Sequence, residues 1–266
     1  MSLDGHYLEV SDRRFERDGV RYITYRSAAI ARRHDMLLVV PPGAAENVPL
    51  VVLLHGVQGS AWAWAFEGGA HETIARLVDE GEVPPLALVL PSDGLWGDGS
   101  GYLAQPHGPD HEQLILDVPR IARLVDERIT ETSPIFVAGY SMGGYGALRL
   151  GAKHPAVYRA VSAHSSITSL AELQEFVGDD ISGVIADSDD ASVLYWMTRN
   201  ATRLPPVRFD CGVDDRLIEP NRALHEALRS QDIAHSFDEF PGGHDWDYWR
   251  THLADSLRFF AGRLGY

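Results

Sequence analysis

The chain of 266 residues, 45% of them hydrophobic, is long enough to bury a substantial core, and one α/β domain of this size is ordinary. Its formal net charge of −15 at pH 7 argues against nucleic acid or an anionic membrane surface as a partner. Cys211 is the only cysteine, which excludes an intramolecular disulfide and a metal cluster held by cysteines.

No apolar stretch approaches the ~20 residues that a membrane-spanning helix requires. Residues 1–14 are polar and charged and lack the apolar core of a secretory signal peptide. We therefore expect a cytoplasmic protein without a membrane partner. The sequence leaves the oligomeric state open.

Apolar runs and helical patterns alternate along most of the chain. We expect strands at 20–27, 35–40, 50–54, 86–90, 135–138, 160–163, 207–210 and 236–240, and helices at 71–80, 111–130, 142–153, 219–231 and 248–263. The continuous apolar run at 50–54 is typical of a central strand buried on both faces. The alternation predicts a mainly parallel sheet with helices on both faces, in a single α/β domain over residues 1–266.

Residues 165–206 interrupt this alternation between two of the predicted strands. Connections of this length are uncommon unless they carry function. We interpret the segment as a short cap over the functional site, and a decorated surface loop is the alternative.

The sequence Gly139-Tyr140-Ser141-Met142-Gly143 follows an apolar run and precedes an Ala/Leu-rich segment. This order predicts a strand, a sharp turn and a helix, with Ser141 at the apex. A serine hydroxyl is a weak nucleophile, and such a turn lifts it clear of the backbone towards a base. The glycines are needed because neighbouring chains crowd the turn. Ser141 is the predicted nucleophile.

On a sheet of this kind an acid and then a histidine follow the nucleophile along the chain. Among the later histidines, His244 lies in a glycine-rich loop after the last predicted strand, where a general base is required. His164 follows a strand but precedes every acid candidate. The remaining four are interpreted as surface residues: His154, His225, His235 and His252.

The acid is expected to follow the strand at 207–210. Asp210, Asp214 and Asp215 all lie there. Asp210 is expected to belong to the strand itself, and spacing does not separate the other two.

Two backbone N–H groups are required to bind the oxyanion of an acyl-transfer reaction. We expect one from Met142, directly after the nucleophile. The other is expected from Val57, in the glycine-containing loop that follows the strand at 50–54.

Five tryptophans lie near the loops of this predicted site: Trp62, Trp64, Trp96, Trp246 and Trp249. Trp62, Trp96 and Trp246 are candidates for binding the substrate, although large aromatic side chains equally often fill the core. Asp93 and Asp98 flank a loop that lacks the dense oxygen-ligand spacing of a calcium site, so it is interpreted as a polar turn. No metal or organic cofactor is expected.

Five motifs together resemble the putative esterase family of α/β-hydrolases, which groups esterase D and S-formylglutathione hydrolases, feruloyl and acetylxylan esterases and the antigen 85 mycolyltransferases. The motifs are Leu-Leu-His-Gly (53–56), Pro-Ser-Asp-Gly (91–94), Gly-Tyr-Ser-Met-Gly-Gly (139–144), Cys-Gly-x-x-Asp-x-Leu (211–217) and Gly-Gly-His-Asp-Trp-x-Tyr-Trp (242–249). The resemblance implies an α/β-hydrolase fold and a triad of Ser141, His244 and Asp215. It also supports Val57 and Met142 as oxyanion donors.

The hypothesis from the sequence is a serine carboxylesterase that hydrolyses small-molecule acyl esters through an acyl-enzyme intermediate. An acyltransferase with a sugar or alcohol acceptor would use the same residues. A catalytically silent binding module on the same fold is the third alternative.

Overall fold

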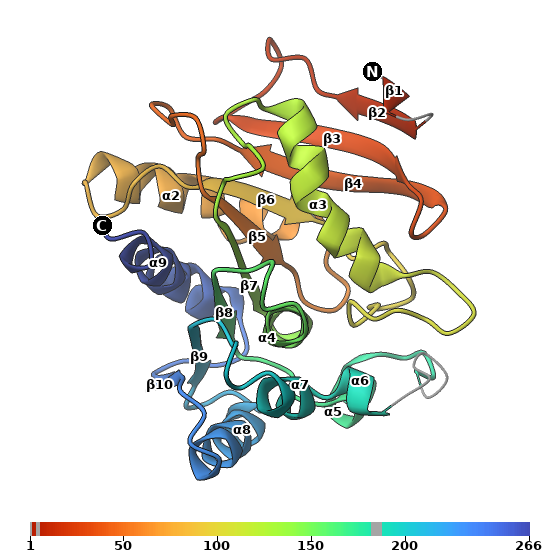
Figure 1. Ribbon diagram of the computed structural model, residues 1–266, viewed down its shortest axis with the longest axis vertical. Helices are drawn as coiled ribbons and strands as arrows, with labels where there is room; N and C mark the ends of the chain where they lie inside the picture. Colours follow the sequence, from red (N-terminus) through yellow and green to blue (C-terminus); the bar gives the residue numbers. More distant parts are fainter. Residues whose placement is uncertain (1, 4–5, 182–187) are drawn as a thin grey trace.

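The computed structural model describes residues 2–3, 6–181 and 188–266, and a ten-stranded sheet runs through them (Figure 1). The strand order across the sheet is β1-β2-β3-β4-β6-β5-β7-β8-β9-β10. The strands are β1 (Ser2–Leu3), β2 (His6–Val10), β3 (Val20–Ser27), β4 (Arg32–Val39), β5 (Leu50–Leu54), β6 (Ala87–Pro91), β7 (Ile135–Tyr140), β8 (Ala160–His164), β9 (Val207–Gly212) and β10 (Ser236–Phe240).

The sheet is parallel where the sequence predicts it. In the order β6-β5-β7-β8-β9-β10, every pair of neighbouring strands is parallel. Strands β1 to β4 pair antiparallel with one another, and β4 pairs antiparallel with β6. The carboxyl ends of β5, β7, β8, β9 and β10 therefore meet at one edge. Strands β1 and β2 lie in the N-terminal segment, where no strand was predicted, and they pair at the outer, antiparallel edge of the sheet.

Helices cover both faces of the sheet (Figure 1). They are α1 (Ala63–Phe66), α2 (Ala70–Asp79), α3 (His111–Val125), α4 (Met142–Lys153), α5 (Leu170–Phe176), α6 (Ser188–Ala191), α7 (Val193–Arg199), α8 (Ile218–Ser230) and α9 (Trp246–Gly262). The side chains of α3, α4, α7 and α8 pack on one face, and those of α1, α2 and α9 on the other.

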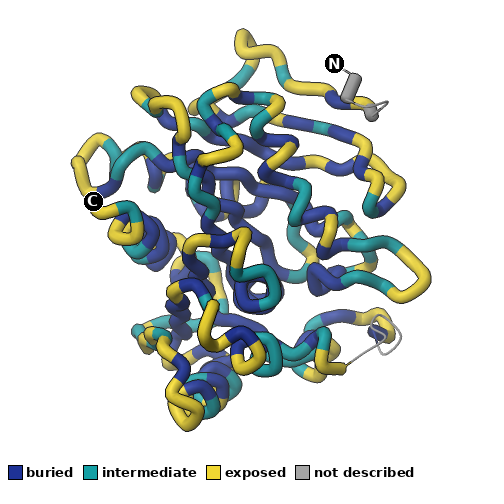
Figure 2. Tube along the Cα trace, viewed as in Figure 1, coloured by how far each residue is buried: buried dark blue, intermediate teal, exposed yellow. Residues whose placement is uncertain are grey.

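The position of β5 between two core clusters explains why its sequence is apolar throughout. Leu50, Val52 and Leu54 belong to one core cluster, and Val51 and Leu53 belong to the cluster on the opposite face. All five are buried, so alternation between core and solvent never arises. Figure 2 shows the same pattern in the central strands, with exposed residues gathered in the outer loops.

The helix predicted at 111–130 is wrong in its last turn. The chain leaves the helix at Asp126, whose backbone is extended. The carboxylate of Asp126 instead accepts hydrogen bonds from the Arg128 backbone N–H and guanidinium. The Arg128 carbonyl accepts a hydrogen bond from the Val48 N–H, so the segment after Asp126 binds the chain just before β5.

Helices α5, α6 and α7 lie in the segment 165–206, and residues 182–187 of this predicted cap fall outside the described residues. A buried ion cluster ties its second part to the body of the protein. Arg149 of α4, whose side chain is 1% exposed, pairs with Glu112 of α3 at 2.7 Å and with Asp190 of α6 at 2.7 Å. Lys153 also pairs with Glu112.

The Glu112 carboxylate makes this cluster sensitive to acid. Burial raises its pKa, but the hydrogen bond with His154 and the charges of Arg149 and Lys153 outweigh burial and lower the pKa to about 2. A carboxyl with a lower pKa in the folded chain stabilises the fold above its unfolded pKa, and the stabilisation is lost as the pH falls towards the folded pKa.

We predict that Glu112→Gln lowers the free energy of unfolding by about 3 kcal/mol at pH 7, and that this deficit shrinks to roughly half near pH 3.3. Urea unfolding of wild type and variant at several pH values, followed by circular dichroism, measures the difference. Glu131→Gln at an exposed position is the matched control, with a difference near zero at every pH. A deficit in Glu112→Gln that stays constant down to pH 3.3 contradicts the prediction.

Candidate active site

Ser141 stands at the turn between β7 and α4 in a left-handed backbone conformation, with φ +55°. Its N–H donates to the His164 carbonyl at 3.0 Å. A Cβ at Gly139 would collide with the backbone of Gly143, and one at Gly143 would collide with the Leu54 carbonyl of β5. The crowding that the motif predicts is present, and it explains both glycines.

The structure brings Ser141, His244 and Asp215 together. The His244 Nε2 atom lies 3.1 Å from the Ser141 Oγ, and its Nδ1 atom lies 2.9 Å and 3.1 Å from the two Asp215 oxygens. Ser141 and Asp215 are buried, whereas the His244 side chain is 20% exposed. The imidazole therefore stands between a buried carboxylate and the nucleophile candidate while remaining open to solvent.

Asp215 is held as a carboxylate. Burial raises its pKa, but the hydrogen bond and charge of His244 and the hydrogen bond from the Leu217 N–H outweigh burial, so the pKa lies below its usual range. A carboxylate accepts the His244 Nδ1–H, which leaves Nε2 as an acceptor for the Ser141 hydroxyl. This is the proton arrangement that nucleophilic catalysis by serine requires.

The other two acid candidates do not reach His244. Asp214 is exposed, and Asp210 lies within β9, as predicted, where it is fully buried. Asp210 accepts a hydrogen bond from Tyr248 at 2.8 Å, pairs with Arg208 at 2.8 Å and lies 2.9 Å from the His164 Nδ1.

The interpretation of His252 as a surface residue is wrong, because this side chain stacks on Phe240 and is buried.

His164 and Asp210 form a second hydrogen-bonded set that resembles the first. The Ser256 Oγ lies 2.7 Å from the His164 Nε2 and 2.6 Å from the Ser162 Oγ. All four side chains are fully buried. No substrate carbonyl can approach them, so we assign them to joining β8, β9 and α9 beneath the turn at Ser141.

The backbone segments that carry Val57 and Met142 lie close to Ser141 and to the loop at Gly99. A Cβ at Gly56 would lie 3.3 Å from the Ser141 Cβ, and one at Gly99 would contact Met142 and Val57. The N–H groups of Val57 and Met142 donate to no acceptor within the described ranges. The two predicted donors thus lie beside the same loop, near Ser141.

A buried network that the sequence reasoning did not assign orients this loop. The Asp93 N–H donates to the His55 Nε2 at 3.0 Å, which leaves the His55 Nδ1–H to donate to the Gly56 carbonyl at 2.7 Å. That carbonyl belongs to the peptide that carries the Val57 N–H. His55 and Asp93 both belong to family motifs, Leu-Leu-His-Gly (53–56) and Pro-Ser-Asp-Gly (91–94), but only the fold brings the two motifs into contact.

The tryptophan candidates separate in the structure. Trp246 stands edge-on to Tyr140, with ring centroids 4.8 Å apart, and Trp96 is half-buried against the hydrophobic core. Trp62 is 46% exposed at the start of α1, and no contact in the described part of the chain links it to Ser141 or His244. The ring centroid of Trp249 lies 5.1 Å from that of His244, and the two rings meet edge to face.

Phe176, at the end of α5, was also missed. Its ring centroid lies 5.5 Å from that of His244. The first part of the 165–206 segment therefore reaches the site. A single phenylalanine in a long polar insertion carries no periodic signal that identifies it beforehand.

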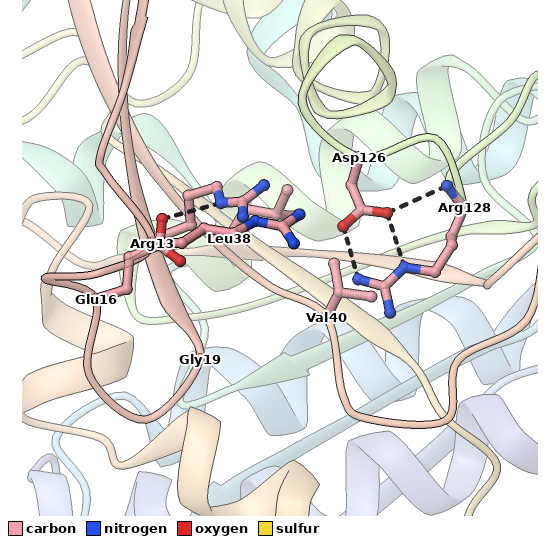
Figure 3. A pocket seen from close by; sticks show the side chains of 8 residues that line it. Arg13, Glu16, Gly19, Leu38, Val40, Asp126 and Arg128 are labelled. Atoms are coloured by element: carbon pink, nitrogen blue, oxygen red, sulfur yellow. Dashed lines mark hydrogen bonds and ion pairs between the residues drawn. The ribbon is translucent and has the colours of Figure 1, made fainter.

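A separate hollow of about 190 Å³ contains none of these residues (Figure 3). Its lining includes Arg13, Leu38 and Asp126, and Figure 3 shows Asp126 facing Arg128. Because the Arg128 carbonyl binds the N–H just before β5, the hollow lies at the amino end of that strand.

Two further findings concern the described residues alone. No group of three or more His, Cys, Asp or Glu side chains among them is placed to hold a metal ion. No helix in that part of the chain is long and apolar enough to cross a membrane.

The Asp93 carboxylate accepts hydrogen bonds from the N–H groups of Leu95 and Ser100, which close the loop that follows β6.

Residues 27–260 match the sequence profile of the family described as "Putative esterase". The chain belongs to this family. It is 27% identical over 236 residues to an acetyl esterase of Caldicellulosiruptor saccharolyticus, across 82% of this chain and 85% of the relative.

Solved structures resemble the esterase across nearly its whole length. The fluorophosphonate-binding serine hydrolase FphF of Staphylococcus aureus matches with a TM-score of 0.79 and 18% identity, over 91% of this chain and 98% of that one. S-formylglutathione hydrolase of Agrobacterium tumefaciens matches with a TM-score of 0.75 and 20% identity, over 94% and 97%. The predicted α/β-hydrolase fold and the predicted serine esterase class are confirmed.

The crowding at the turn yields a stability prediction. We expect Gly143→Ala to destabilise the esterase by more than about 3 kcal/mol or to prevent folding, because the new methyl meets the backbone carbonyls of Leu54 and His55, which have no room to move. Thermal unfolding of the purified variants measures the effect.

Gly262→Ala is the matched control, since it also replaces a helical glycine but meets no atom within 4 Å. It is expected to be neutral or to stabilise by up to about 1 kcal/mol. Equal unfolding temperatures for the two alanine variants would refute the packing argument.

Proposed function

We propose that the protein is a serine carboxylesterase for small-molecule acyl esters, with Ser141 as nucleophile, His244 as general base and Asp215 as the acid that orients it. The observation that carries the proposal is the unbroken hydrogen-bond path from the Ser141 Oγ through both His244 nitrogens to the Asp215 carboxylate. The exposure of the imidazole supports access by a substrate and by water.

The proposed reaction begins when the Ser141 Oγ bonds to the ester carbonyl carbon and its proton passes to the His244 Nε2. The N–H groups of Val57 and Met142 bind the oxyanion that forms. When the tetrahedral adduct collapses, the bond to the alcohol oxygen breaks and His244 returns the proton to that oxygen. Water activated by His244 then releases the acid from Ser141.

Two features support a site for small acyl groups. The acetyl esterase relative acts on an ester whose acyl group its name gives as acetyl. Phe176 of α5 lies against His244, which supports the interpretation of the segment 165–206 as a cap within one domain. We keep Trp96 and Trp246 as substrate-contacting candidates, and Trp62 as a more distant one. A cytoplasmic location stays a prediction from the sequence.

The first test replaces the nucleophile. Ser141→Ala is expected to lower kcat for p-nitrophenyl acetate by at least about 10⁴-fold and to leave the unfolding temperature within a few degrees of wild type, because the alanine removes the attacking oxygen alone. A fluorophosphonate probe with intact mass analysis is expected to label wild type and not the variant.

Ser256→Ala is the matched control, since Ser256 makes a serine–histidine contact of the same kind in the buried set. It is expected to keep activity and labelling. If Ser256→Ala loses labelling while Ser141→Ala keeps it, the proposed assignment is wrong and the nucleophile belongs to the buried set.

The second test concerns the oxyanion loop. His55→Leu removes the hydrogen bond from the His55 Nδ1–H to the Gly56 carbonyl and the acceptor of the Asp93 N–H, and it leaves the Gly59 N–H as the remaining donor to that carbonyl. We expect kcat to fall by roughly 10- to 100-fold while KM changes little, because the Val57 N–H acts mainly on the transition state. His107→Leu, at an exposed loop position, is the control and is expected to behave as wild type. An unchanged kcat in a folded His55→Leu variant would remove His55 from this role.

A further inference from the structure

Arg216 occupies an unusual position beside the candidate active site. It directly follows Asp215 in the loop between β9 and α8, and its side chain is exposed. Its guanidinium carbon lies 3.5 Å from the ring centroid of Phe176, so the two groups are in stacking contact. Because Phe176 also contacts His244, this cation stands at the rim of the site.

The guanidinium is not neutralised by a carboxylate. Arginines such as Arg222, Arg229 and Arg258 pair with acids at 2.5 to 2.6 Å, whereas Arg216 forms no ion pair and donates no hydrogen bond within residues 2–3, 6–181 and 188–266. In a chain with 38 acidic residues and a net charge of −15, an unpaired cation beside a catalytic histidine is a distinctive local charge.

Stacking on Phe176 also limits the freedom of the side chain. An arginine held flat on an aromatic ring keeps its N–H donors available at the edge of the guanidinium plane. Less side-chain entropy is then lost when those donors bind a ligand. The planar group of N–H donors matches the two oxygens of a carboxylate.

We propose that Arg216 is a specificity-determining residue that binds a carboxylate carried by the ester, so that the preferred substrates are anionic esters. This inference rests on the proposed function of the Ser141 site and adds the charge class of its substrate. The carboxylate belongs either to the acyl part or to the alcohol part of the ester. In both cases Arg216 contacts the substrate away from the scissile bond, and the chemistry at Ser141 is unchanged.

The test compares pairs of esters of similar size and shape, one anionic and one neutral. For the acyl side, p-nitrophenyl hydrogen succinate is paired with the neutral p-nitrophenyl 4-methylpentanoate. For the alcohol side, 4-acetoxybenzoate is paired with 4-acetoxybenzamide. Uncatalysed hydrolysis is subtracted in each case, and kcat/KM is measured for wild type, Arg216→Gln and Arg216→Lys.

Wild type is expected to favour the anionic member of at least one pair. Arg216→Gln is expected to lower kcat/KM for that ester by roughly 10-fold or more, the range of a charge-assisted hydrogen bond, mainly through KM. Its neutral partner is expected to change by less than about 3-fold. Arg216→Lys is expected to recover part of the loss, because it keeps the charge without the planar fork.

Arg13→Gln, at an exposed arginine that is not part of the site, is expected to match wild type on all four esters. The proposal is overturned if wild type prefers the neutral member of both pairs. It is also overturned if Arg216→Gln lowers both members of a pair equally, since Arg216 would then only support Phe176 and His244. Failure of the Ser141 assignment is distinguishable, because it would appear as unimpaired hydrolysis of the neutral esters by Ser141→Ala.

Discussion

The left-handed turn at Ser141, enclosed by glycine backbones, is the constraint on which the rest of the site depends. A serine at φ +55° is held at a cost of about 1–3 kcal/mol, and the surrounding hydrogen bonds offset that cost. The Ser141 N–H binds the His164 carbonyl, and the Ser141 carbonyl accepts from Ile167 and Tyr145. Because Gly143 also packs on the end of β5, the turn lies directly against the strand end from which the loop carrying Val57 leaves.

Sheet register sets the distance between the acid and the base. Strands β9 and β10 pair in parallel with Gly212 opposite Phe240, so the loops that follow them start side by side. The Val213 N–H donates to Phe240 and the Asp214 N–H donates to Gly242, which ties the two loops together. Asp215 and His244 thereby meet although 29 residues separate them.

Two buried layers support this arrangement from below. The polar layer of His164, Asp210 and Ser256 joins β8, β9 and α9, and Tyr248, near the start of α9, donates to Asp210 in the same layer. The aromatic layer contains Trp64, Tyr140, Trp246 and Trp249, whose rings stack or meet edge to face. Trp249 and Phe176 both contact His244, so packing as well as the carboxylate holds the imidazole.

Local sequence by itself determined the alternation of strands and helices, the turn at Ser141 and the loop position of His244. Each of these follows from the periodicity of neighbouring residues or from glycines that a crowded turn requires. The sequence pattern also placed Val57 and Met142 beside the expected strand ends, and the structure brings the Gly56 backbone, directly before Val57, close to Ser141.

The tertiary structure decided which carboxylate meets the histidine, where local spacing left Asp214 and Asp215 equivalent and only the family motif pointed to Asp215. Strand pairing buries Asp210, exposes Asp214 and turns Asp215 towards His244. The contacts of His55 with Asp93 and of Arg216 with Phe176 likewise join segments distant in the chain. Their physical basis is the register and packing of separate elements, which no local pattern of residues encodes.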